Sequence, residues 1–287
     1  MIQSFVASWG LFHQSYLAGW LIILLLSLIG VLVVARDQIF IGAAISQAST
    51  LGVALTMGAA ALLPEDRFPW LHSTIFLSAM AVIFSVVASS ITGHGGSSGK
   101  ESHEAITGWV FLISSSLSIL LVSHSPHGLE EVHRLLSSSI IGATTFDVWV
   151  FGILTALTVA LLSIFYRKIL LFSLDPSMAL SVGMRIKTWN VMTSAWLGLA
   201  VGLSIRSSGM LYTFGCLVLP ALVAKNLCRE VRYMFLMAPL VALVIGVTGS
   251  VLANSYDYPP GQMTVSLLCL LLMFVWLFRA AIDKRRS

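Results

Sequence analysis

Long apolar segments recur along this chain, separated by short stretches that carry charges, glycine or proline. Each segment runs for about 20 residues, which is enough for a helix to cross a hydrocarbon core of about 30 Å. Because the segments are continuously apolar and do not alternate, they predict spanning helices and not the strands of a barrel. We predict about nine spans, or about eight if two weak ones merge. They lie near residues 17–35, 40–62, 70–91, 105–123, 148–166, 188–205, 210–228, 233–252 and 261–280.

The composition excludes an ordinary soluble domain. Hydrophobic residues make up 57% of the chain and charged residues only 10%, with a mean hydropathy of +0.94. A soluble globular domain carries about 25% charged residues, so this chain has too few charges to cover a water-exposed surface. The predicted fold class is therefore all-α, a polytopic transmembrane helical bundle that forms a single domain over residues 1–287.

The basic residues indicate the orientation of this bundle. With a cytoplasmic C-terminus, most Lys and Arg residues fall on the cytoplasmic side, as the positive-inside rule requires. An odd number of spans then places the N-terminus outside. Because the charges gather at the ends of spans, the net charge of +4 does not indicate a nucleic-acid partner. The residues on the predicted cytoplasmic side are Arg36, Lys100, Arg167, Lys168, Arg185, Lys187, Lys225, Arg229, Arg232 and Lys284 to Arg286.

Three connections are long enough to be more than turns. Residues 92–104 are rich in Gly and Ser and predict a flexible cytoplasmic loop. Residues 124–147 predict a short amphipathic helix at the outer interface. In the cytoplasmic segment near 168–187, Asp175 is predicted to cap a helix that begins at Pro176 and ends at Gly183. Such a short helix between spans is suited to contact a cytoplasmic partner.

Small and polar residues mark two of the predicted spans. Gly198 and Gly202 have the spacing of a helix-packing motif, and residues 42–52 are unusually rich in small side chains. Packing explains both patterns, but it does not explain why Ser46, Gln47 and Thr50 are polar inside a span. An unpartnered amide in lipid is costly, so Gln47 should face other helices or water. We interpret it as a candidate lining residue of a pathway.

Several segments, in order along the chain, resemble the metal-type permeases of ABC importers, which carry zinc, manganese or iron(II) after delivery by a metal-binding lipoprotein or periplasmic protein. One of them is similar to the family's coupling pattern Phe-Asp-Pro-x-x-Ala-x-x-x-Gly. The segments are LVVARDQIFIGAAISQASTLGVAL (32–55), ESHEAITGWVF (101–111), LLFSLDPSMALSVGM (170–184), GMLYTFGCLVLPALVAKNL (209–227) and DYPPGQMTV (257–265).

The resemblance implies a type II ABC importer-like permease in a bacterial inner membrane. It assigns Asp175, Pro176, Ala179 and Gly183 to coupling with a cytoplasmic ATPase. It also implies an extracytoplasmic metal-binding protein, a second permease subunit that is identical or different, and surrounding membrane lipid as partners. The cargo is a divalent metal ion, and no cofactor is expected to be bound by the chain.

One departure from the family pattern concerns the metal pathway. Where the family typically has Asp and His one helical turn apart, this chain has Ala43 and Gln47. In the family these two side chains are implied to hold the metal inside the membrane. Carboxylate and imidazole at i and i+4 share one helix face, whereas Ala43 offers no ligand and Gln47 only a neutral amide oxygen. Either a different permease subunit retains the ligands, or the substrate is handled otherwise.

Other metal ligands are weaker candidates. His124, His127 and His133 lie in the predicted outer connection, where a binding protein would release metal. The favoured alternative is a solvated interfacial helix whose charges face water, as is usual for short polar outer segments. Asp147 and Asp257 lie near the outer ends of spans, where they attract cations or serve as a helix cap and a turn residue.

Three classes of function remain to be compared. The chain has no GxxxxGK[ST] phosphate loop, so an ABC permease needs a separate ATPase and is not itself an enzyme. The alternative is a stand-alone secondary transporter or channel for a cation, which would require carboxylates or broken helices within the membrane. A membrane enzyme would require an activated Ser or a metal site inside the spans, and no His lies deep inside an apolar segment.

Overall fold

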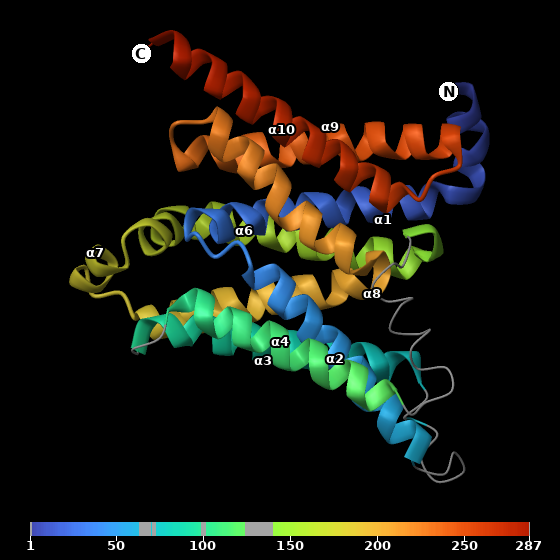
Figure 1. Cartoon of the computed structure of the whole chain (residues 1–287), viewed down its shortest axis with the longest axis horizontal. Helices are drawn as coiled ribbons and strands as arrows, with labels where there is room; N and C mark the ends of the chain where they lie inside the picture. The colour runs from blue at the N-terminus through green and yellow to red at the C-terminus, as the bar shows by residue number, and fades with distance from the viewer. Residues whose placement is uncertain (1, 63–69, 71–72, 99–101, 124–139, 287) are drawn as a thin grey trace. The chain divides into compact units, whose positions relative to one another are not determined.

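The computed structural model describes residues 2–62, 70, 73–98, 102–123 and 140–286. These residues form helices and no strand, so the predicted all-α fold is confirmed in the described part of the chain (Figure 1). Eight of the helices are long and apolar enough to cross a membrane. The helices are α1 (Ile2–Ala35), α2 (Ile41–Leu62), α3 (Thr74–Ser98), α4 (His103–Val122), η2 (Ile140–Gly142), α6 (Thr145–Leu174), α7 (Pro176–Ser181), α8 (Ile186–Leu227), α9 (Val231–Tyr256) and α10 (Pro260–Arg286).

Helix α8 is interrupted at Gly209. The backbone there has φ 79° and ψ 168°, a conformation that only glycine adopts readily. With 42 residues, α8 measures about 63 Å at 1.5 Å per residue, about twice the thickness of a hydrocarbon core. The break therefore separates the two predicted spans 188–205 and 210–228. The structure therefore has eight long helices where the sequence predicts nine spans, because α8 contains two of the predicted spans.

The helices gather into two compact units, and each draws on distant parts of the sequence. One unit contains α1, α6, α9, α10 and the part of α8 from Leu211 onward. The other contains α2, α3, α4, α7 and the part of α8 up to Met210. The expectation of a single domain over residues 1–287 stays a prediction.

In the first unit, α1 packs against α6 and α9 (Figure 1). Apolar side chains fill the contact at one end of α1. Toward the other end of α1, the Tyr16 hydroxyl donates to Asn254 Oδ1 at 3.1 Å and Trp20 Nε1 donates to Ser250 Oγ at 3.2 Å. These contacts hold α1 and α9 together along most of their length. The apolar cluster consists of Val31, Val34, Ala221, Ala224, Met234 and Ala238.

In the second unit, α2 packs against α3 and α4, and α3 also contacts the first part of α8. A Cβ atom added at Gly198 would lie 2.6 Å from Val86 Cα, and one at Gly202 would lie 2.8 Å from Ser85 Oγ. The two glycines therefore allow the backbones to approach closely, and the predicted packing role of the motif is confirmed.

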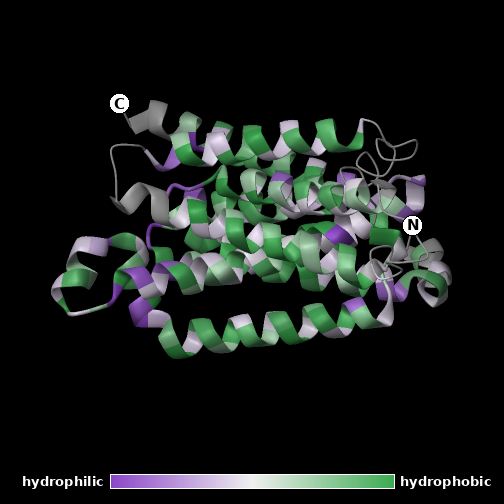
Figure 2. Cartoon of the chain, turned by 90° about the horizontal axis from the view of Figure 1, so that it is seen from below, coloured by the Kyte–Doolittle hydropathy of each residue, from purple (hydrophilic) through white to green (hydrophobic). Residues whose placement is uncertain are grey.

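Apolar residues predominate along the helices, and polar residues gather nearer their ends (Figure 2). On α6, for example, Trp149, Ile153 and Leu157 are all exposed. Exposed large apolar side chains on a helix that is long enough to cross a bilayer are suited to contact lipid. The chain is a multi-pass membrane protein.

The prediction of a loop over residues 92–104 is wrong for its first half, because α3 continues through Ser98. Side-chain contacts explain the difference. Thr92 Oγ1 donates to Ala88 O at 2.9 Å within the helix. Asn190 Nδ2 of α8 donates to Gly93 O at 3.0 Å. These bonds stabilise a helical turn that the glycines alone would disfavour.

The close approach at Gly198 leads to a stability prediction. Replacing Gly198→Ala should destabilise the protein by about 1–3 kcal/mol, because the new methyl group would overlap the backbone of α3. Thermal unfolding of the purified full chain in detergent, followed by tryptophan fluorescence, measures the change.

Gly108→Ala is the matched control. Gly108 lies in α4 of the same unit, and a Cβ there would meet no atom within 4 Å. This variant should be neutral or stabilised by up to about 1 kcal/mol through helix propensity. Equal melting temperatures for the two variants would contradict the packing described for Gly198.

Candidate translocation helix and coupling helix

The predicted pathway residues of α2 are buried. Ala43 and Gln47 are each 9% exposed, and Ser46 and Thr50 are at most 1% exposed. Ala43 and Gln47 lie four residues apart, as do Ser46 and Thr50, so each pair shares one helix face. Helix α2 therefore contacts protein on these faces within its own unit.

The hydroxyl groups of α2 mostly bond to their own helix. Ser46 Oγ donates to Gly42 O at 2.7 Å, and Thr50 Oγ1 donates to Ser46 O at 3.1 Å. Such bonds satisfy a hydroxyl inside an apolar environment without a partner from another element. The hydroxyl of Ser49 is the exception, since it is buried and has no hydrogen-bond partner among the described residues.

The amide of Gln47 meets another helix. Its Nε2 atom lies 3.4 Å from the sulfur of Met210, which directly follows the break in α8 at Gly209. The expectation that Gln47 faces another helix or water is therefore confirmed. Met210 was not predicted from the sequence. The only sequence signal for this contact was the isolated Gly209 in an apolar segment.

The chemistry of α2 does not favour a metal site formed by this chain. Ala43 has no ligand atom, and the thioether of Met210 is a soft ligand that does not suit hard divalent cations. Among the residues that the structure describes, no three His, Cys, Asp or Glu side chains gather where they could hold a metal ion. The predicted ligands His124, His127 and His133 lie outside the described residues.

The short helix α7 has the predicted N-terminal cap. Asp175 Oδ1 accepts hydrogen bonds from the Met178 amide at 2.9 Å and from Ser177 Oγ at 2.5 Å. The bond from Ser177, followed by the backbone bond from Met178, lowers the pKa of the Asp175 carboxyl. Pro176 occupies the first helical position, where its missing amide proton costs nothing.

The C-terminus of α7 is closed by Gly183, whose φ is +83°. The Gly183 amide donates to Leu180 O at 2.9 Å, and the Met184 amide donates to Ala179 O at 3.0 Å. This pair of bonds is a Schellman motif, which needs a left-handed residue at the position of Gly183. The predicted end of the helix is confirmed.

The side chains of α7 face two ways. Ala179 is fully buried, whereas Ser177 and Ser181 are exposed. Met178, Leu180 and Val182 are 56%, 63% and 66% exposed. Met178 and Val182 lie four residues apart and share one side of the helix, whereas Leu180 lies on another side. We name these three exposed apolar side chains together the α7 face (Met178, Leu180, Val182).

The two aspartates near span ends have structural roles. Asp147 Oδ2 accepts from the amide and the hydroxyl of Thr144, both at 2.8 Å, and so caps α6. Asp257 ends α9 in a left-handed conformation with φ 55°. The interpretation of these residues as a cap and a turn residue is confirmed.

Comparisons with known proteins agree with this architecture. A model of the family described as the ABC 3 transport family matches residues 9–279. The manganese import system permease protein ScaB of Streptococcus gordonii is 26% identical over 282 residues, which cover 96% of each chain. The manganese transport system membrane protein MntC of Listeria innocua is 22% identical over 250 residues, which cover 87% of this chain and 84% of that protein.

A solved structure supports the fold. The structure of PsaBC from Streptococcus pneumoniae in complex with Fab superimposes with a TM-score of 0.77 at 19% identity, and covers 96% of this chain and 95% of the other. At this identity the likeness establishes the fold alone. The family match covers nearly the whole chain, and it establishes that this protein belongs to the ABC 3 transport family, the metal-type permeases of ABC transporters.

Proposed function

We propose that this chain is one membrane subunit of an ATP-driven importer for divalent transition-metal ions, with manganese the first candidate ahead of zinc and iron. Manganese is favoured because the relatives ScaB and MntC are named for manganese transport. The importer works with a cytoplasmic ATPase, a second permease subunit and an extracytoplasmic metal-binding protein. The observation that carries the proposal is α7, a capped helix with an exposed apolar face.

The α7 face is the proposed contact for the ATPase. Helix α7 directly follows α6 and is joined to α8 by a few residues, so a force on α7 acts on two long helices. Its ends are fixed by Asp175 and Gly183, which lets the helix move as a rigid body and not unwind. Exposed apolar side chains at a rigid element are typical of a protein contact. ATP-driven movement of the ATPase would in this way reach the membrane helices.

The second permease subunit is proposed to differ from this chain. Carboxylates and imidazoles are the side chains that bind manganese, zinc or iron, and α2 carries neither at positions 43 and 47. A dimer of two identical chains would therefore lack these ligands on both sides. In a heterodimer, this chain supplies one packed wall of the metal pathway, and its partner supplies the side chains that bind the metal.

The orientation follows from the positive-inside rule. The break at Gly209 supports two crossings by α8, and so an odd number of crossings overall. The C-terminus is then cytoplasmic, and the N-terminus lies outside. Helix α7 and the last turn of α8, which contains Lys225, then lie on the cytoplasmic side with the ATPase. The membrane is proposed to be a bacterial inner membrane.

The α7 face provides a test of coupling. Leu180→Asp should reduce co-purification of the ATPase by about tenfold or more, because it places a charge in an apolar contact. The chain itself should fold normally, since Leu180 is 63% exposed. Affinity purification of the permease from cells that express the whole transporter, with the bound ATPase quantified, measures the effect.

Leu227→Asp is the matched control, since Leu227 is also an exposed leucine, 53% exposed, at the end of α8. It should retain the ATPase. A Leu180→Asp protein that holds as much ATPase as wild type would refute the assignment of α7.

The absence of a ligand in α2 provides a separate test. In cells that express the whole importer, Gln47→Ala should lower the initial rate of manganese uptake by less than about tenfold, because it removes a hydrogen bond to Met210 and no metal ligand. Loss of a ligand, or of a residue that supports one, commonly costs 10-fold to 100-fold.

Met210→Leu is the control, because it keeps the volume of the side chain and removes the same contact. The two variants should behave alike. If Gln47→Ala stops uptake while Met210→Leu does not, the amide oxygen of Gln47 binds the metal, and the proposal of a ligand-free wall is wrong.

A further inference from the structure

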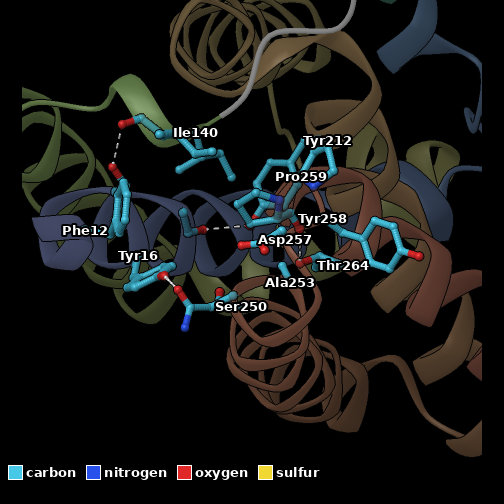
Figure 3. A pocket seen from close by; sticks show the side chains of 15 residues that line it. Phe12, Tyr16, Ile140, Tyr212, Ser250, Ala253, Asp257, Tyr258, Pro259 and Thr264 are labelled. Carbon is cyan, nitrogen blue, oxygen red and sulfur yellow. Dashed lines mark hydrogen bonds between the residues drawn. The ribbon is translucent and has the colours of Figure 1, made fainter. Parts of the chain in front are cut away.

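A cavity of about 320 Å³ lies within the first unit, between the N-terminal part of α1, the C-terminal end of α9 and the start of α10 (Figure 3). Cavities that bind small ligands range from about 300 to 1,000 Å³, so this cavity holds a small group and not a long chain. No residue of the proposed pathway or of α7 lines it. We name it the α1–α9 cavity. Its lining comprises Phe12, Ser15, Tyr16, Gly19, Ile140, Ile141, Tyr212, Ser250, Ala253, Asn254, Asp257, Tyr258, Pro259, Pro260 and Thr264.

Aromatic rings form much of its wall. Phe12, Tyr16, Tyr212 and Tyr258 all contribute to the lining. The hydroxyls of Tyr16 and Tyr212 are engaged, since the first donates to Asn254 and the second donates to Gly19 O at 3.0 Å. Their bonds fix the rings in place. The faces of aromatic rings carry negative potential and attract cations.

Among the described residues that line the cavity, Asp257 alone carries a formal charge. Figure 3 shows it near the centre of the view, with Ala253, Tyr258 and Thr264 around it. Its backbone amide donates to Ala253 O and closes α9. Asp257 is exposed, and its carboxylate makes no hydrogen bond or ion pair with another described residue. A cation next to this carboxylate would be attracted by its charge, with the modest strength of an exposed ion pair.

The Ser and Thr hydroxyls of the lining do not favour an anion. Ser15 Oγ donates to Ile141 O at 3.0 Å, Ser250 Oγ donates to Gly246 O at 2.8 Å, and Thr264 Oγ1 donates to Pro260 O at 2.8 Å. Their protons are therefore used within the protein. A divalent metal ion is also disfavoured, because it needs several oxygen ligands and the cavity offers a single carboxylate.

We propose that the α1–α9 cavity binds an organic ammonium group attached to an apolar body, with the cation at Asp257 and the body against the aromatic rings. The ammonium group comes either from a free amine or from the ethanolamine headgroup of a lipid. This inference does not depend on the proposed transport function, since it uses neither α2 nor α7.

The test uses 2-phenylethylamine as the probe and 2-phenylethanol as its uncharged analogue. The full chain is placed in nanodiscs of phosphatidylglycerol, and binding is measured by calorimetric titration. The amine should bind, and the alcohol should bind at least about fivefold more weakly, because it lacks the charge. Asp257→Asn should weaken amine binding by a similar factor. Asn also adopts the left-handed conformation, so α9 should keep its end.

Asp147→Asn is the matched control, since it removes the same charge from a cap outside the cavity and should leave binding unchanged. Repeating the titration in phosphatidylethanolamine nanodiscs identifies the source of the ammonium group. Weaker apparent binding there indicates a competing lipid headgroup, whereas equal binding indicates a free amine.

Three results would overturn the proposal. The first is the absence of amine binding by the wild-type chain. The second is equal binding of the amine and the alcohol. The third is displacement of the amine by manganese chloride at the same concentration as the amine, which would make the cavity part of the metal pathway. If Asp257→Asn instead weakens only the association of an added extracytoplasmic protein, the cavity is a protein docking site and the proposal is also wrong.

Discussion

Every polar group inside a membrane span must find its partner within the protein, because the hydrocarbon core offers none. In the second unit this constraint directs Ser46 and Thr50 to the carbonyl groups of their own helix, and Gln47 to the sulfur of Met210. Ser49 and Ser85, whose buried hydroxyls have no partner among the described residues, are exceptions. The consequence for α2 is a closely packed helix in which Ser46, Gln47 and Thr50 are already engaged, whereas Ser49 is not. Such a helix is suited to be a wall and not a binding site.

The same constraint moves the accessible chemistry to the ends of the helices. At α7, the caps at Asp175 and Gly183 satisfy the backbone, which leaves an apolar face free for a partner. At the α1–α9 cavity, the Ser and Thr hydroxyls donate to backbone carbonyl groups, and Asp257 carries the only formal charge among the described lining residues. In the proposed importer, transport of a metal ion would therefore depend on the proposed contacts, namely an ATPase at α7 and a second permease subunit that carries the ligands.

Local chemistry explains which features the sequence could predict. The spans and both ends of α7 depend on apolar length and on residues within a few positions of each other, such as Asp175 with Met178, so they could be recognised. The helical turn at residues 92–98 depends on Asn190, which lies almost a hundred positions away, and a glycine-rich stretch gives no sign of it. The contact of Gln47 with Met210 depends on the break at Gly209. The division into two units, whose segments alternate along the sequence, depends on contacts between segments that are far apart in the chain. Neither has a local signal.

In the proposed importer, the membrane helices of this chain move metal only when an ATPase drives α7. The most direct measurement is uptake of radioactive manganese by proteoliposomes that contain this chain, its partner permease and the metal-binding protein, with or without the ATPase and ATP. The account predicts uptake against a manganese gradient only when ATPase and ATP are both present, and none with a non-hydrolysable ATP analogue. Uptake at the same rate without the ATPase would contradict it and would indicate a stand-alone transporter or channel.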